Sequence, residues 1–192
     1  MIGNDIIDLE LFRKETNWKR DNYLKKLFTE TEQQQILDSQ EPELLVAIFW
    51  AMKEASYKAH QRKFSQSRTY NPSAFECEIY SDLNNSDLKG SVIILEQNYS
   101  AEISRTEEYI HCIAFSTPQQ KNQKIFEKEV NIKLELRTYY SKLKKISLVD
   151  ISIEKDHNFI PHLLNKGVDE NENFSISHHG KLSAFVLALT NS

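Results

Sequence analysis

Trp50-Ala-Met-Lys-Glu-Ala-Ser-Tyr-Lys58 is the stretch of the sequence that decides the fold. It lies within a longer segment, residues 42–62, in which apolar residues recur at helical spacing. On a helical wheel they form one broad stripe: Leu44, Leu45, Ile48, Phe49, Met52, Ala55 and Ala59. The opposite side is uncharged in its first turns and leads to Glu54 and Lys58. We therefore predict a helix that is covered on both sides, with Glu54 facing an enclosed space.

A buried carboxylate is costly unless it is paired or bound to a metal. Lys58 lies four residues after Glu54, so an ordinary ion pair within the helix is the simplest interpretation of this segment alone. Asp5 adds a second carboxylate. It lies in a predicted strand, residues 2–10, whose alternation places Gly3, Asp5, Ile7 and Leu9 on one face. Asp5 alone could cap a neighbouring loop, but two inward carboxylates together suit Mg²⁺.

Ser175-Ile-Ser-His-His-Gly180 is a third candidate site, between two short predicted strands. Hydroxyl groups, tandem imidazoles and a glycine can bind a phosphate group through hydrogen bonds. A turn with one buried and one solvated histidine is an equally good interpretation of this segment.

The rest of the chain predicts two helix-plus-sheet parts. Thr29 and Glu32 form a predicted capping box at the start of a helix. We expect strands at 75–80, 92–97, 99–105 and 109–115, and a polar connection at 116–123. A helix over 124–145 and strands at 148–155, 174–177 and 183–189 are expected to follow. The chain would then divide into 1–117 and 122–192, two related subdomains that act as one unit.

Composition excludes several classes of protein. The net charge is −4 over 192 residues, which gives no general attraction to nucleic acid or to an anionic membrane. No apolar run approaches the roughly 18 residues of a membrane span. The acidic residues near the start argue against a signal peptide, and Cys77 and Cys112 have no metal-ligand spacing. We expect a cytoplasmic protein with reduced cysteines.

Positive charge is nevertheless concentrated near the N-terminus. Between Arg13 and Lys26 only Glu15 and Asp21 oppose six basic residues. We call these six the basic docking surface: Arg13, Lys14, Lys19, Arg20, Lys25 and Lys26. They form either a solvated helix face or a docking site for an acidic partner.

Four segments together resemble one family, the 4'-phosphopantetheinyl transferases. Gly3-Asn-Asp-Ile-Ile-Asp8 resembles the G-x-D-I signature that opens the holo-acyl-carrier-protein synthases. Residues 23–32 resemble their F-L-x-x-I-F-T-x-x-E segment. Residues 50–58 match W-x-x-K-E-A-x-x-K, and residues 175–178 match S-I-S-H. The resemblance implies an α+β fold, with two helix-on-antiparallel-sheet subdomains about a pseudo-twofold axis.

The second half resembles the N-terminal half of the longer, surfactin-synthetase-type transferases, so the two halves stand in permuted order. Three positions depart from the longer enzymes. Ile7 replaces the acidic residue two after the metal-binding Asp, and Phe159-Ile160 replaces the G-K before Pro161. His179 follows the S-H histidine at a position that reaches the metal in some longer relatives.

The resemblance also implies site roles. Asp5 and Glu54 would bind Mg²⁺, with His179 as a further candidate ligand. Glu54, or a water bound to the metal, would accept the proton of the attacking serine. Lys58, and more weakly Lys53, would stabilise the departing 3',5'-ADP. Ser177 and His178 would bind the phosphates of coenzyme A, the co-substrate.

The partner implied is an apo-acyl-carrier protein that contacts the basic docking surface. The chain would act as a monomer in fatty-acid, polyketide or peptide biosynthesis. Two alternatives remain open: a catalytically silent module that binds carrier proteins, and a Mg²⁺-dependent phosphoesterase using Asp5, Glu54 and His178. Joint retention of Asp5, Glu54 and Lys58 disfavours the silent module.

Overall fold

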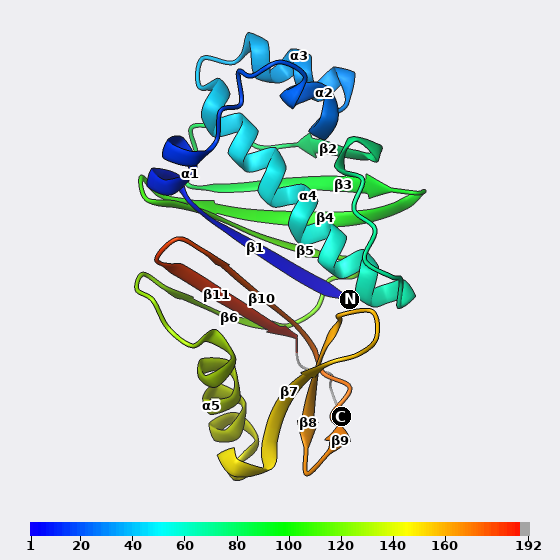
Figure 1. Cartoon of the computed structure of the whole chain (residues 1–192). Helices are drawn as coiled ribbons and strands as arrows, with labels where there is room; N and C mark the ends of the chain where they lie inside the picture. The colour runs from blue at the N-terminus through cyan, green and yellow to red at the C-terminus, as the bar shows by residue number, and fades with distance from the viewer. Residues whose placement is uncertain (189–192) are drawn as a thin grey trace.

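The computed structural model describes residues 1–188, and its first part is a five-stranded antiparallel sheet with a long helix across one face (Figure 1). The strand order is β1-β5-β4-β3-β2. The strands are β1 (Ile2–Asp8), β2 (Phe75–Ile79), β3 (Asp87–Ile94), β4 (Gln97–Arg105) and β5 (Tyr109–Phe115). The helices are α1 (Leu9–Glu15), α2 (Tyr23–Leu27), α3 (Glu30–Asp38), α4 (Pro42–Phe64) and the single turn η1 (Pro72–Ala74).

Helix α4 is the predicted central helix, and it is buried on both sides as expected. It lies across β1 and β5. The approach to β1 is so close that a Cβ on Gly3 would collide with the Ala55 carbonyl oxygen. Gly3, Asp5 and Ile7 all face this helix, as the predicted alternation requires.

Two local predictions at helix starts have different outcomes. The capping box is confirmed: the Glu32 N–H donates to Thr29 Oγ1 at 3.2 Å, and the Thr29 N–H donates to Glu32 Oε2 at 2.9 Å. The first strand is shorter than predicted. It ends at Asp8 because the Asp8 carboxylate accepts from the Leu11 N–H at 3.1 Å and caps α1.

The second part of the described chain has two small antiparallel sheets, β10-β11-β6 and β7-β8-β9, and one helix. Its strands are β6 (Lys121–Phe126), β7 (Ile151–Lys155), β8 (Pro161–Asn165), β9 (Val168–Asp169), β10 (Asn173–His179) and β11 (Leu182–Ala188). The helix is α5 (Ile132–Lys144), followed by the single turn η2 (Leu148–Asp150). Leu189, placed in the last predicted strand, lies outside the described residues.

The prediction of a helix over 124–145 is wrong in its first part. Residues 121–126 form β6, and α5 begins only at Ile132. The reason is tertiary. Strand β11 is buried throughout and needs a hydrogen-bonded neighbour on each edge, and β6 supplies the second one.

Strands β1 and β10 lie side by side where the two parts meet (Figure 1). Among the described residues, three hydrogen bonds join β1 to β10, and two of them come from the buried Asn4. Its N–H donates to Ser175 Oγ at 3.0 Å, and its Nδ2 donates to Ser177 Oγ at 2.9 Å. Apolar contacts complete the seam: Ile2, Ile113, Phe115, Val186 and Ala188 in one cluster, and Ile6, Leu182 and Ala184 in another.

None of the helices within residues 1–188 is both long and apolar enough to cross a membrane.

Candidate functional site

Asp5, Glu54 and Lys58 come together where α4 crosses β1. Glu54 and Lys58 leave the same side of the helix because they are four residues apart. Lys58 Nζ donates to Asp5 Oδ1 and to the main-chain oxygen of Asn4, at 2.9 Å in each case. The ion pair thus joins Lys58 to Asp5, on the neighbouring strand, instead of to Glu54.

The environment of Glu54 disfavours a negative charge. Its pKa is raised to about 7, first by burial and then by the neighbouring Asp5 carboxylate, while Lys58 acts in the opposite direction. Two adjacent carboxylates that share one close cation, Lys58, are a donor set that suits Mg²⁺. This ion takes one or two protein carboxylates together with phosphate oxygens and water. Asp5 and Glu54 therefore fit the expected metal.

His179 has a structural partner of its own. Its Nδ1 accepts from the Asp8 N–H at 3.0 Å, across the seam, which uses the lone pair of that nitrogen. No three His, Cys, Asp or Glu side chains within residues 1–188 are grouped as a metal centre. The role of His179 as a ligand stays a prediction, and this hydrogen bond argues against Nδ1 as the ligand atom.

A cavity of about 500 Å³ lies between the two parts of the chain. Glu54 and Lys58 line it from α4, and Ser177 and His178 line it from β10. Its cationic side chains come from four separate segments: Lys58, Arg62, Arg68, Lys133 and Lys155. Glu54 is the one acidic residue among the described residues that line it. The cavity therefore suits a ligand with several phosphate groups.

A second cavity, of about 320 Å³, also reaches Glu54. Its polar lining includes Asp5, Thr16, Glu54, His178 and His179, and its aromatic walls are Phe12, Tyr23 and Trp50. Those three residues come from α1, α2 and α4, next to the basic docking surface. Glu54 and His178 line both cavities, so these two side chains mark the point where two ligands could meet.

Ser177 and His178 differ in how free they are. The Ser177 hydroxyl is buried and accepts from Asn4 Nδ2, which leaves its own hydrogen available to a ligand. The His178 side chain is exposed between the two cavities. Both positions agree with contact to a phosphate group, and both roles stay predictions.

The prediction that Lys53 contacts coenzyme A is wrong. Its side chain is 0% exposed and forms a buried ion pair with Glu32 at 2.7 Å. Its other two hydrogens go to the main-chain oxygens of Pro72, at 2.8 Å, and Phe75, at 2.6 Å. An ammonium group has three donors, and all three are used. Lys53 therefore ties α3 and the segment before β2 to α4.

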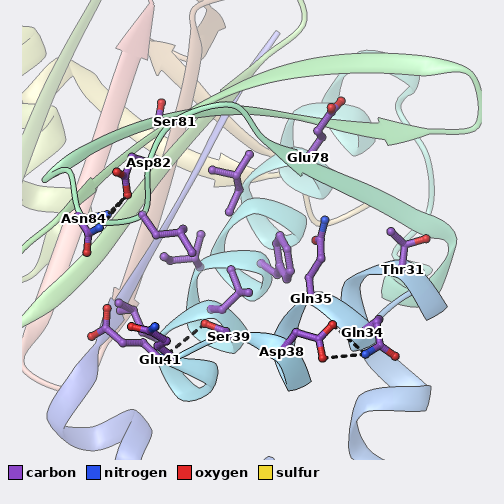
Figure 2. Close-up of a pocket in the computed structure, with 17 residues that line it drawn as sticks. Thr31, Gln34, Gln35, Asp38, Ser39, Glu41, Glu78, Ser81, Asp82 and Asn84 are labelled. Atoms are coloured by element: carbon purple, nitrogen blue, oxygen red, sulfur yellow. Dashed lines mark hydrogen bonds between the residues drawn. The ribbon is translucent and has the colours of Figure 1, made fainter.

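A larger cavity lies away from this chemistry. Figure 2 shows it between α3, the start of α4 and the segment after β2, with a volume of about 1150 Å³. Its described lining contains no Lys or Arg but four carboxylates: Asp38, Glu41, Glu78 and Asp82. Such a lining repels phosphate groups, so the smaller cavity at the seam is the better site for a nucleotide.

The six residues of the basic docking surface are all exposed, on α1, on α2 and on the segment that joins these helices. Arg13 pairs with Glu43 at 3.1 Å, and Lys14 pairs with Glu10 at 2.5 Å. These exposed pairs are weak and can exchange partners at little cost. The surface borders the second cavity through Phe12 and Tyr23.

Sequence reasoning missed several residues of the site. Arg62 continues the Glu54 and Lys58 side of α4 at the same four-residue interval, so this residue was predictable. It donates to the Pro161 carbonyl oxygen at 2.6 Å, and burial lowers its pKa to about 10. The other missed cations are Arg68, Lys133 and Lys155. Each lies on a segment whose approach to the cavity depends on the tertiary fold.

The fold and the site define an α+β protein in which helices pack on antiparallel sheets and a carboxylate pair borders a cation-lined cavity. The profile of the 4'-phosphopantetheinyl transferase superfamily matches residues 1–114, more than half of the chain. The chain belongs to this superfamily, whose members transfer phosphopantetheine and act on carrier proteins, and the resemblance found in the sequence is confirmed. A search of curated proteins gave no significant match. The permuted order of the halves stays a prediction.

Proposed function

We propose that this chain transfers 4'-phosphopantetheine from coenzyme A to a serine of an apo-acyl-carrier protein, with Mg²⁺ as the metal. The observation that carries the proposal is the position of Glu54. It lies between a cation-lined cavity and a second cavity that opens beside a basic surface. A transferase needs two substrates to meet at one base, and Glu54 offers that arrangement.

Coenzyme A would occupy the cavity between the two parts. The pyrophosphate and the 3'-phosphate carry the negative charge that Lys58, Arg62, Arg68, Lys133 and Lys155 can neutralise. Ser177 and His178 would add hydrogen bonds to the phosphates from the opposite wall. Asp5 and Asn4 use only two of the three ammonium hydrogens of Lys58, so the third is available to the departing 3',5'-ADP.

Asp5 and Glu54 would bind the Mg²⁺. When bound there, the ion would neutralise charge on the phosphoryl oxygens. Lys58 holds the Asp5 carboxylate in place through the ion pair at 2.9 Å.

Glu54 would accept the proton of the carrier serine. The serine oxygen forms a bond to the phosphorus that carries the pantetheine arm. The bond from this phosphorus to the bridging oxygen breaks, and 3',5'-ADP leaves with that electron pair. Burial and the Asp5 carboxylate raise the pKa of this glutamate in the metal-free protein, which makes it a better proton acceptor than an ordinary glutamate, and a bound Mg²⁺ would lower that pKa again.

The carrier protein would dock on the basic docking surface and present its serine to the second cavity. Exposed charges of this kind mainly raise the association rate with an acidic partner. We further propose that residues 1–117 and 122–192 act as one unit, because their contacts build both walls of the cavity. One chain would then hold one complete site and act as a monomer.

The variants Glu54→Gln and Asp5→Asn test the assignment of the carboxylates. We expect each to lower transfer by about 100-fold or more, which is the usual contribution of a general base or metal ligand. Circular dichroism should show an unchanged fold, and Glu10→Gln is the matched control on the surface. Wild-type turnover by a folded Glu54→Gln protein in limiting Mg²⁺ would overturn the assignment.

A further inference from the structure

The loop between β7 and β8 forms one edge of the cation-lined cavity. Phe159 and Ile160 of the loop line the cavity, together with the flanking strand residues Lys155 and Pro161. In Figure 1 this loop extends from the second part of the chain toward the C-terminal end of α4. It occupies the segment in which the sequence departs from the longer transferases.

Hydrogen bonds fix the shape of this loop. The Asp156 carboxylate accepts from the N–H groups of Asn158 and Ile160, at 2.9 Å in each case. Asn158 ties the loop to α4: its Nδ2 donates to the Ser65 carbonyl oxygen at 2.7 Å, and its own carbonyl oxygen accepts from Gln61 at 2.9 Å. The backbone of the residue between these anchors is therefore held in a defined place.

That residue is Phe159, which is unusual in two respects. Its φ angle is +64°, a left-handed conformation that bulky residues rarely adopt. Its side chain is 60% exposed, whereas Tyr57 and Phe174, which also line the cavity, are buried. Strained residues concentrate at binding sites. A rigid loop thus presents an aromatic ring at the edge of a cavity lined by cations.

We propose that the Phe159 ring stacks on the adenine of coenzyme A. This inference rests on the proposed function. It assigns a contact to the adenine base, which the residues around the phosphate groups leave unbound. Adenine is the one aromatic group of coenzyme A, and stacking on an aromatic side chain is its usual mode of recognition. Lys155, the last residue of β7 before this loop, supplies a cation for a neighbouring phosphate.

The position of the loop along α4 agrees with this assignment. Ser65, which anchors Asn158, follows Glu54 by eleven residues. A helix rises about 1.5 Å per residue, so the anchor lies roughly 16 Å along the axis from Glu54. The adenine lies at the end of the nucleotide away from the pantetheine arm, so a loop placed beyond Lys58 and Arg62 is on the correct side of the phosphates.

The test uses Phe159→Asn, which removes the ring and keeps a residue that tolerates positive φ, and Phe159→Trp, which keeps an aromatic ring. Calorimetric titration of each protein with three ligands separates the parts of coenzyme A: coenzyme A itself, 3',5'-ADP and 4'-phosphopantetheine. We expect Phe159→Asn to bind coenzyme A and 3',5'-ADP about tenfold more weakly and 4'-phosphopantetheine as the wild type does. Phe159→Trp should bind all three normally, and 3',5'-ADP should quench its added fluorescence.

Unchanged affinity of Phe159→Asn for 3',5'-ADP would overturn the stacking role, provided that the wild type binds this ligand. A loss confined to 4'-phosphopantetheine would overturn it too, because the ring would then contact the pantetheine arm. A wild-type protein that binds neither coenzyme A nor 3',5'-ADP would refute the proposed function, and this inference with it.

Discussion

Replacing Lys53 by methionine separates stability from substrate binding at a position where sequence reasoning gave the wrong role. Methionine has a similar length and removes the charge. The change leaves the Glu32 carboxylate buried without its cation, and the Pro72 and Phe75 carbonyl oxygens lose a donor. Removing one partner of a buried ion pair costs about 3–5 kcal/mol. For a chain of this size, that cost corresponds to a fall of roughly 6–20 °C in Tm.

The assay is urea unfolding followed by tryptophan fluorescence, together with calorimetric titration of coenzyme A into the folded protein. We expect Lys53→Met to lose stability by this amount and to bind coenzyme A with nearly wild-type affinity at low temperature. Lys58→Met should show the opposite pattern, with a large loss of affinity and a smaller loss of stability. Lys14→Met, an exposed lysine paired only with Glu10, is the control for charge removal. Wild-type stability of Lys53→Met combined with lost affinity for coenzyme A would refute the structural role.

Three further predictions concern docking, pH and assembly. Replacement of Arg13, Lys19 and Arg20 by Glu should weaken binding of the carrier protein much more than binding of coenzyme A. Lys142→Glu on α5 is the control and should affect neither affinity. Equal losses of both affinities would indicate misfolding. Burial, and secondarily Lys58, lowers the pKa of His111 to about 4, so this side chain is neutral in the folded state and takes up a proton near pH 6.5 on unfolding. The stability that His111 contributes is present above pH 6.5 and is lost as the pH falls toward 4. Between pH 7 and 5 the wild type should lose about 2 kcal/mol more of its unfolding free energy than His111→Asn. The same change of unfolding free energy with pH in both proteins would contradict this account. A mixture of inactive Glu54→Ala and inactive His178→Ala proteins should stay inactive if each chain holds its own site, and recovered activity would show a site shared between subunits.

Local patterns predicted the elements whose residues interact along the chain. The apolar stripe of α4 and the capping box at Thr29 depend on spacing within one helix, and both are confirmed. The alternation of β1 places Asp5 toward α4, where it meets Lys58. These contacts could be predicted because neighbours at intervals of two or four residues share a face.

Contacts between distant segments could not be predicted in the same way. Lys53 is adjacent to Glu54, but only the positions of α3 and η1 show that it is enclosed. Residues 121–126 have no strong strand pattern and form β6 because β11 needs a second neighbour. Lys133 and Lys155 reach the cavity from α5 and β7, which no spacing in the sequence indicates.

Mass spectrometry of an apo-acyl-carrier protein incubated with this chain, coenzyme A and Mg²⁺ is the most direct test of the central claim. The account predicts that the carrier gains one 4'-phosphopantetheine group on a serine, that 3',5'-ADP is released in equal amount, and that Glu54→Ala abolishes both. A carrier whose serine is replaced by alanine is the control. Binding of the carrier without modification would indicate a silent binding module. Cleavage of coenzyme A without modification of the carrier would indicate a phosphoesterase, and either result would contradict the transferase assignment.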